Sequence, residues 1–400
     1  MAEASVLTGE RWIFVEDSAF LPAHGGGERE HLGMLEAARD AGILAAIVLP
    51  VSKGDSPGPY AQVFPGTPVV AVPRHLGAWR LLDPRYPYTV SSRSPQRSLV
   101  NRMRSVVPDA TGIVVTSYKS WAIAKALADG LQLPVVLRMH NREGLYHHSL
   151  AQGSHGPRAL ALRWEARRIE RDELRLQRAS WVHGVADISR SDAEWRRSTG
   201  ALNVAHVPPF AVRMDGLSAI ERPERTDPVV VFVGALDVPT NTDAVAWLVE
   251  RVWPVVVATA PQARLSVVGR APSQKLRSMV LSAQGGEVHA DVPDVQPYLR
   301  GARLAVNPAV SGSGVNIKLV DYLAAGIPVV STSHALRGLD LVAGHDVLIA
   351  DDPQDFALAI IDLLNDPDRA NQVGRQGRIA IHALLDEQAN LERVCALLHR

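Results

Sequence analysis

Residues 311–332, SGSGVNIKLVDYLAAGIPVVST, combine residue types that suit a bound phosphorylated sugar. A Gly-Ser-Gly turn precedes a segment of helical periodicity that carries Lys318 and Asp321. Backbone amides at such a helix start could surround a phosphate, and Lys318 could add positive charge there. A carboxylate accepts two hydroxyl donors well, so Asp321 could hold a ribose. The simpler interpretation is an exposed Lys318–Asp321 ion pair, worth about 0.2–0.5 kcal/mol.

Two stretches of the first half carry other candidates. Gly25, Gly26 and Gly27 precede a helix expected to begin near Glu28, where free amides could dock an anion or a sugar oxygen. A flexible loop explains these glycines equally well, and their spacing is not the G-x-G-x-x-G dinucleotide fingerprint. His140 follows the apolar run PVVLRM. At a strand's carboxyl end it could donate a hydrogen bond or hold a proton, or it could only cap the next helix.

Short runs rich in Val, Ile and Leu recur along the chain, separated by segments of helical length. Most are continuously apolar, as expected of strands buried on both faces of parallel sheets. The alternation predicts right-handed βαβ units, in which ligands bind beyond the carboxyl ends of the strands. The predicted strands begin near residues 11, 43, 68, 112, 134, 181, 229, 264, 287, 304, 328 and 346.

A polar, proline-rich segment at residues 208–228 divides these runs into two groups. We therefore predict an α/β fold with an N-terminal domain at residues 1–212 and a C-terminal domain at 213–380. We also predict two helices in residues 366–400. The last segment, 381–400, could cross back to the N-terminal domain.

The bulk composition excludes several classes of protein. The 42 basic and 42 acidic side chains cancel, which gives no electrostatic argument for nucleic acid. The single cysteine, Cys395, excludes an internal disulfide and favours a reducing, cytoplasmic location. The sequence MAEASVLTGERWIFVED is not a secretory signal, and no apolar run reaches the ~20 residues of a membrane span. Peripheral membrane contact through a basic patch formed only in the fold stays open.

Most of residues 229–341 resembles the nucleotide-sugar-binding domain of family-four glycosyltransferases. The resembling segments are FVGALDVPTNTDAVAWLVERVWP, ARLSVVGR, ADVPDVQPYLRGARLAVNPAVSGSGVNIKLVDYLAAGIPVVST and LRGLDL. The first half resembles the family more weakly, through HGGGERE and RMHNREGLYHH. The resemblance implies two facing Rossmann-like domains, the GT-B architecture, with the active site in the interdomain cleft.

The resemblance also implies roles for individual residues. His140 would face the donor sugar, and Asp321 the ribose. Gly25, Gly26 and Gly27 would face the donor phosphates, and Gly314, Val315 and Asn316 the sugar and phosphates. Gly312 and Ser313 belong to the same turn, whose amides we expect around a phosphate. Two departures stand out: Ser313 replaces a frequent acid, and Ala235 with Thr240 or Asn241 replaces a frequent Arg–Lys pair. The diphosphate charge would then fall to Lys318 and Arg270.

The resulting hypothesis is a retaining, hexosyl-type glycosyltransferase that uses a UDP- or GDP-sugar and requires no metal cofactor. The acceptor would be a small molecule, a glycan or a protein, and no nucleic acid is expected as a partner. One alternative is a nucleotide-sugar epimerase of the same fold. Another is a non-catalytic nucleotide-sugar-binding relative, an alternative that the missing basic pair keeps open. An NAD-dependent dehydrogenase is disfavoured because the dinucleotide fingerprint is absent.

Overall fold

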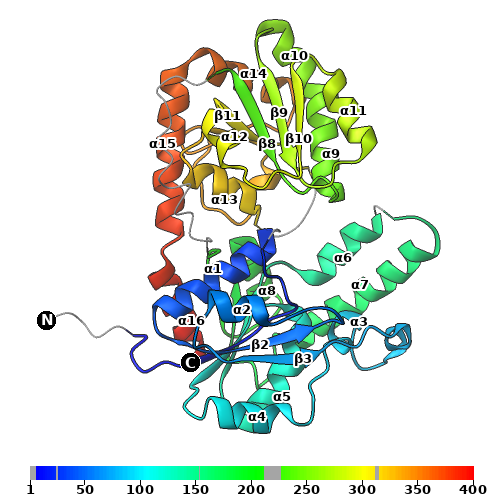
Figure 1. Ribbon diagram of the computed structural model, residues 1–400, viewed down its shortest axis with the longest axis vertical. Helices are drawn as coiled ribbons and strands as arrows, with labels where there is room; N and C mark the ends of the chain where they lie inside the picture. The colour runs from blue at the N-terminus through cyan, green and yellow to red at the C-terminus, as the bar shows by residue number, and fades with distance from the viewer. Residues whose placement is uncertain (1–5, 24–25, 153, 211–226, 311–314) are drawn as a thin grey trace, which may run out of the picture. The chain divides into compact units, whose positions relative to one another are not determined.

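The computed structural model describes residues 6–23, 26–152, 154–210, 227–310 and 315–400 (Figure 1). The chain separates into two compact units. Unit 1 comprises Met1–Val212 and Asp386–Arg400, and unit 2 comprises Arg213–Leu385. Among the described residues, no helix combines the length and the apolar character that crossing a bilayer requires.

Unit 1 is built on a sheet of seven parallel strands in the order β3-β2-β1-β4-β5-β6-β7. Strands β1, β4 and β5 lie side by side at its centre, so the residues that follow them gather at one carboxyl edge. The strands are β1 (Trp12–Val15), β2 (Leu44–Val51), β3 (Val69–Pro73), β4 (Gly112–Val115), β5 (Val135–Met139), β6 (Gly184–Asp187) and β7 (Val204–His206).

Helices cover both faces of this sheet because its strands alternate their apolar side chains between two cores. Trp12 and Phe14 pack in one core with α1 (Gly26–Asp40) and α16 (Glu387–Leu398). Ile13 and Val15 belong to the other core. That core takes in α4 (Leu99–Val106), α5 (Trp121–Leu131) and α7 (Gly156–Leu176). The remaining elements are α2 (Gly58–Val63), η1 (Ala78–Leu82), α3 (Tyr88–Ser91), η2 (Tyr118–Ser120), α6 (Glu143–Gln152) and α8 (Arg190–Ser198).

Unit 2 has a sheet of six parallel strands in the order β10-β9-β8-β11-β12-β13. These are β8 (Val229–Val233), β9 (Arg264–Gly269), β10 (Gly286–Ala290), β11 (Leu304–Asn307), β12 (Val329–Ser331) and β13 (Leu348–Ile349). Its helical segments are α9 (Pro239–Trp247), η3 (Leu248–Val252), α10 (Trp253–Thr259), α11 (Gln274–Ser282), α12 (Gln296–Gly301), α13 (Ile317–Ala324), η4 (His334–Leu336), α14 (Pro353–Asn365) and α15 (Pro367–Leu384). Phe232 of β8 lies in a core with α9 and α14, whereas Val231 lies in a core with α13.

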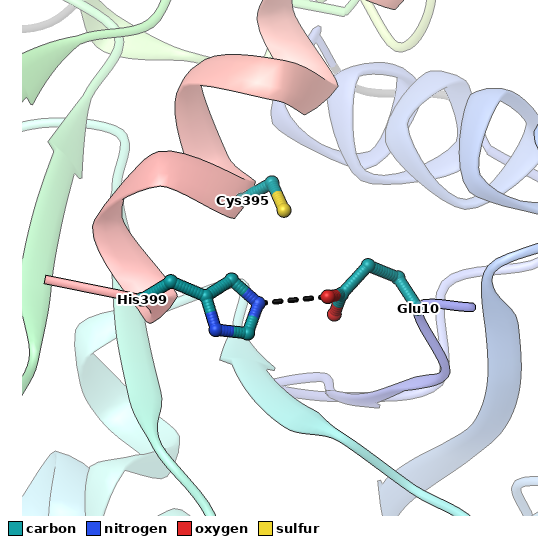
Figure 2. A group of neighbouring side chains, drawn as sticks. All are labelled: Glu10, Cys395 and His399. Atoms are coloured by element: carbon teal, nitrogen blue, oxygen red, sulfur yellow. Dashed lines mark hydrogen bonds and ion pairs between the residues drawn. The ribbon is translucent and has the colours of Figure 1, made fainter. Parts of the chain in front are cut away.

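A small polar cluster joins the N-terminal and C-terminal ends of the described chain within unit 1 (Figure 2). Glu10 Oε1 and His399 Nε2 are bonded at 2.7 Å, and Glu10 Oε2 accepts hydrogen bonds from Trp12 and Thr111 at 2.7 Å each. The neighbouring thiol of Cys395 is buried, which raises its pKa to about 11. Carboxylate, thiol and imidazole are metal ligands, but both Glu10 oxygens already have partners here. We therefore interpret the cluster as structural.

The predicted strands are all present, in two parallel sheets, and the two expected C-terminal helices are α15 and α16. The α/β prediction with two Rossmann-like units is confirmed. Strand β7 was not predicted. It has only three residues, all half-buried at the edge of the sheet, and so lacks the continuous apolar run that marks the other strands.

Candidate functional site

A network of buried charges lies at the carboxyl edge of the unit 1 sheet. Its centre is Glu30 of α1, which is almost wholly buried. Glu30 Oε1 accepts hydrogen bonds from Arg138 Nη2 at 2.6 Å and Nε at 3.2 Å. Glu30 Oε2 is bonded to Nε2 of His140, the residue that follows β5. The carboxylate therefore holds both a buried guanidinium and the candidate catalytic histidine.

A second carboxylate of the network, Glu16, follows β1 and is fully buried. Glu16 Oε2 lies 2.5 Å from His31 Nδ1 and accepts a hydrogen bond from Thr116 Oγ1 at 2.7 Å. The His31 ring stacks on the His140 ring, with centroids 4.5 Å apart and planes 11° from parallel. His31 thus connects the end of β1 to the candidate histidine at the end of β5.

The network sets the charge of each group. Burial opposes the charge of Glu30, but Arg138 and His140 outweigh it and hold the pKa of that carboxyl far below its usual range. Burial likewise opposes a charged His31, yet Glu16 and the other nearby carboxylates raise its pKa to about 9. Burial lowers the pKa of His140, and the neighbouring His31 charge adds to this effect against the attraction of Glu30. At neutral pH, His31 is charged and His140 is neutral.

Glu30, His31 and His140 bring ligand-type atoms within 4.8 Å of one another. Both Glu30 oxygens are engaged, however, and one of them pairs with the fixed positive charge of Arg138. A metal ion would have to displace these contacts beside a guanidinium. The donor set fits an ion-pair network better than a metal centre.

The glycine stretch before α1 differs from the prediction in one respect. The helix begins at Gly26 rather than near Glu28, so Gly26 and Gly27 form its first turn. A Cβ atom at Gly27 would meet nothing within 4 Å, so this turn has open space beside it. Gly25 lies outside the described residues.

In unit 2, Lys318 belongs to α13, but its side chain reaches the carboxyl end of β8. Its Nζ donates a hydrogen bond to Asn241 Oδ1 of α9 at 2.5 Å and lies 4.4 Å from the Phe232 ring centroid. A Cβ atom on Gly234 would lie 3.1 Å from this amine, so the glycine leaves room for it. Burial lowers the pKa of Lys318 to about 7. The half-buried amine bonds to Asn241, not to Asp321, so the simple exposed ion pair is wrong.

The start of α13 carries further candidates. Asn316 is the N-cap residue, and its Nδ2 donates a hydrogen bond to Asn307 Oδ1 at 3.2 Å. The Nδ2 atom of Asn307 is buried and makes no hydrogen bond in the described part of the chain. Val315 and Asp321 are half-buried. The candidates Gly312, Ser313 and Gly314 fall outside the described residues.

Arg270, the second candidate cation, follows β9 and is about half exposed. Its Nε lies 3.5 Å from Asp237 Oδ1, so a carboxylate already offsets its charge. Arg270 remains near the carboxyl edge through the backbone hydrogen bond from Leu236 N to its carbonyl oxygen at 3.0 Å. Among the described residues, no carboxylate pairs with Lys318, which is therefore the better candidate to bind a ligand anion.

Four residues of the unit 1 network were not predicted from the sequence: Glu16, Glu30, His31 and Arg138. Their signal is a charged residue where burial is expected. Arg138 interrupts the apolar strand VVLRM, and Glu30 shares a helix face with Met34. Buried charges of this kind need partners, although the sequence does not say which.

Comparison with known proteins gives a partial match in sequence. Residues 227–366 match the family model described as glycosyl transferases group 1. An uncharacterized 44.6 kDa protein in the cps region of Klebsiella pneumoniae is 30% identical over 139 residues. This match covers 33% of the present chain and 36% of the relative, so it spans roughly a third of the relative's length.

Solved structures match over nearly the whole chain. HepE of Anabaena, crystallised with UDP and glucose, is 12% identical with a TM-score of 0.63 over 98% of this chain and 100% of HepE. A TarM mutant of S. aureus, crystallised with fondaparinux, alpha-GlcNAc-glycerol and UDP, is 11% identical with a TM-score of 0.68, again over 98% and 100%. Sucrose-phosphate synthase of Thermosynechococcus elongatus is 18% identical with a TM-score of 0.62 over 98% of each chain.

These likenesses define the fold. It is the GT-B fold, with two Rossmann-like domains, as predicted. The match to glycosyl transferases group 1 concerns residues 227–366, and Lys318 and Asp321 lie inside the matched range.

Proposed function

We propose that the protein is a retaining glycosyltransferase that moves a hexosyl group from a UDP- or GDP-sugar to a small molecule, glycan or protein, without a metal cofactor. The observation that carries this proposal is the Lys318 amine beside Gly234 and Asn241, in the domain that matches glycosyltransferases. In the part of the chain that the structure describes, this amine has no carboxylate partner, and a buried amine without one is suited to binding a ligand anion. The UDP complexes of HepE and TarM support a nucleoside diphosphate as that anion.

The chemistry of unit 2 would be electrostatic. When the bond between the sugar and the diphosphate breaks, negative charge grows on the leaving phosphate oxygen. Lys318 and the first-turn amides of α13 would stabilise this charge, and Asp321 would accept hydrogen bonds from the ribose hydroxyls. Arg270 would contribute less, because Asp237 already neutralises it.

In unit 1, His140 would contact the donor sugar as a neutral imidazole. Its Nε2 faces the ionised Glu30, so the proton of the neutral ring belongs on Nε2. Nδ1 is then an acceptor and would receive a hydrogen bond from a sugar hydroxyl. Glu30 is committed to Arg138 and His140, which makes it a poor nucleophile. We therefore favour departure and attack on the same face of the sugar over a covalent glycosyl–enzyme intermediate.

The test is a panel of UDP- and GDP-sugars incubated with the protein, with and without a cell extract as the acceptor source. Released nucleoside diphosphate and new glycoside should appear together and only with the extract, and proton NMR should show the anomeric configuration of the donor in the product. A changed sugar in the donor without any acceptor would establish an epimerase instead. Donor binding without either product would establish a non-catalytic binding protein, the alternative that the replaced basic pair keeps open.

A further inference from the structure

Unit 1 exposes large apolar side chains in the segment between β3 and α3. Leu76 is 54% exposed, Trp79 is 67% exposed and Leu82 is 80% exposed. Isolated exposed leucines are ordinary, but a tryptophan and several leucines within one short segment are not. This segment follows β3 at the carboxyl edge of the sheet.

The segment packs against α7, which extends the exposed apolar surface. Arg168 of α7 donates a hydrogen bond to the Leu81 carbonyl oxygen at 3.2 Å and also binds the carbonyl oxygens of Asp83 and Tyr86. The Arg168 guanidinium lies 4.3 Å from the ring centroid of Trp164, which is 48% exposed. We name the resulting area the Trp79–Trp164 surface. It consists of Leu76, Trp79, Leu81, Leu82, Leu160 and Trp164.

The segments that carry this surface are rich in arginine. Residues 74–92 contain three arginines and one acid, Asp83, a net charge of +2 by subtraction, and residues 156–171 contain five arginines and two acids, a net +3. The whole chain has a net charge of zero. The two acids within residues 156–171 face other partners, because Glu165 binds Tyr88 N and Arg168, and Glu170 lies 3.8 Å from His148. The remaining acids of α7, Asp172 and Glu173, are buried.

Four exposed residues of α7 lie on one side of the helix. Leu160, Arg163, Trp164 and Arg167 lie at i, i+3, i+4 and i+7, and all four are exposed. They therefore form one stripe of alternating apolar and basic character on the outside of the helix. Tryptophan, leucine and arginine together are the composition of protein surfaces that lie in the headgroup region of anionic bilayers.

We propose that the Trp79–Trp164 surface binds the headgroup region of an anionic lipid bilayer. Trp79, Leu82 and Trp164 would enter the boundary between headgroups and acyl chains, while the surrounding arginines contact lipid phosphates. If the surface instead bound an acidic protein or a second copy of this chain, substitutions in it would change that association and leave vesicle flotation unchanged. The proposal does not depend on the proposed glycosyl transfer.

The experiment is flotation of the full-length protein with phosphatidylcholine vesicles, with and without about one-third phosphatidylglycerol. The wild type should float with the anionic vesicles, more weakly as salt is raised, and not with phosphatidylcholine alone. Trp79→Ser with Leu82→Ser should lower the partition coefficient on the order of tenfold. Arg163→Gln with Arg167→Gln should lower it about fivefold per arginine.

The matched control is Leu202→Ser with Leu281→Ser, which removes two leucines that are 96% and 62% exposed elsewhere on the chain. This control should bind vesicles like the wild type, and thermal melts should show that all variants fold. The proposal is overturned if the wild type ignores anionic vesicles or if the surface variants bind as well as the control. It is also overturned if light scattering shows that the Trp79→Ser, Leu82→Ser pair only dissociates an oligomer without changing flotation.

Discussion

Binding of a nucleoside diphosphate is expected to draw a proton onto Lys318. Desolvation beside Phe232 and Asn241 lowers the pKa of the free amine to about 7, and no carboxylate pairs with the amine among the described residues. A diphosphate next to the amine favours its charged form and raises this pKa in the complex. Binding should therefore take up about 0.5 proton at pH 7 and about 0.9 proton at pH 8, the fractions of amine uncharged at a pKa of 7.

Titration calorimetry with UDP measures this uptake directly. At fixed pH, the slope of the binding enthalpy against the ionisation enthalpy of the buffer equals the number of protons taken up. Measurement at pH 8 isolates the lysine, since a terminal phosphate with a pKa of about 6 is then almost fully ionised. Lys318→Met should bring the slope close to zero, whereas Lys275→Met, on the exposed side of α11, should leave it unchanged.

The affinity should follow the same linkage. The protonated amine binds the anion, so affinity is highest below pH 7 and falls as pH rises towards the pKa of the complex, by up to about tenfold per pH unit. Lys318→Met should weaken UDP binding strongly and uridine binding little. The reasoning is refuted if the wild type takes up no proton at pH 8, or if the variant loses UDP and uridine affinity equally.

Four other perturbations test individual contacts. Asp321→Ala should weaken donor binding by roughly 1.5–3 kcal/mol, and unchanged affinity by calorimetry in a folded variant would remove it from the site. His140→Ala should lower turnover about 10²–10⁴-fold with a smaller effect on donor binding. A variant that melts like the wild type and keeps nearly full turnover would show that His140 only caps the next helix. Glu30→Gln leaves the buried Arg138 without its carboxylate, so urea unfolding should show a loss of about 3–5 kcal/mol, and a loss below 1 kcal/mol would contradict the buried pair. The pKa of His31 is raised from 6.5 to about 9 in the folded protein, so protonation of its ring stabilises the folded state. This contribution to the free energy of unfolding is complete below pH 6.5 and is lost as the pH rises through about 9. Stability should therefore fall over that window in the wild type and stay flat in His31→Gln.

The strands could be predicted because burial on both faces leaves a continuous apolar run in the sequence. Where burial is partial, the signal disappears, as in β7. The first residue of a helix is harder to predict when glycines precede it, because glycine can adopt the conformation of a first turn as readily as that of a loop. Helix α1 therefore begins at Gly26 and not near Glu28.

The unit 1 network could not be predicted because its contacts join residues far apart in sequence. Glu30 meets Arg138 across 108 positions and His140 across 110. These pairs depend on the strand order that places β1 beside β4 and β4 beside β5, and one sequence does not fix that order. The position of His140 after a strand could be predicted, but its neutral state could not, since it follows from burial of the ring and from the charge on the stacked His31.

The basic residues missing after β8 are compensated in space rather than in sequence. β8 and β11 are neighbours in the sheet, so α9 and α13, which follow them, both begin near the same carboxyl edge. A long side chain from α13 can therefore reach a position that the resemblance assigned to residues before and within α9. Lys318 does so, and Asn241, standing where a basic residue was expected, accepts its hydrogen bond. A basic residue at position 241 would face the Lys318 amine as a like charge at hydrogen-bond distance, which is unfavourable. In this chain Asn241 and Lys318 thus form one arrangement, and the absence of an Arg–Lys pair after β8 does not by itself argue against a diphosphate site.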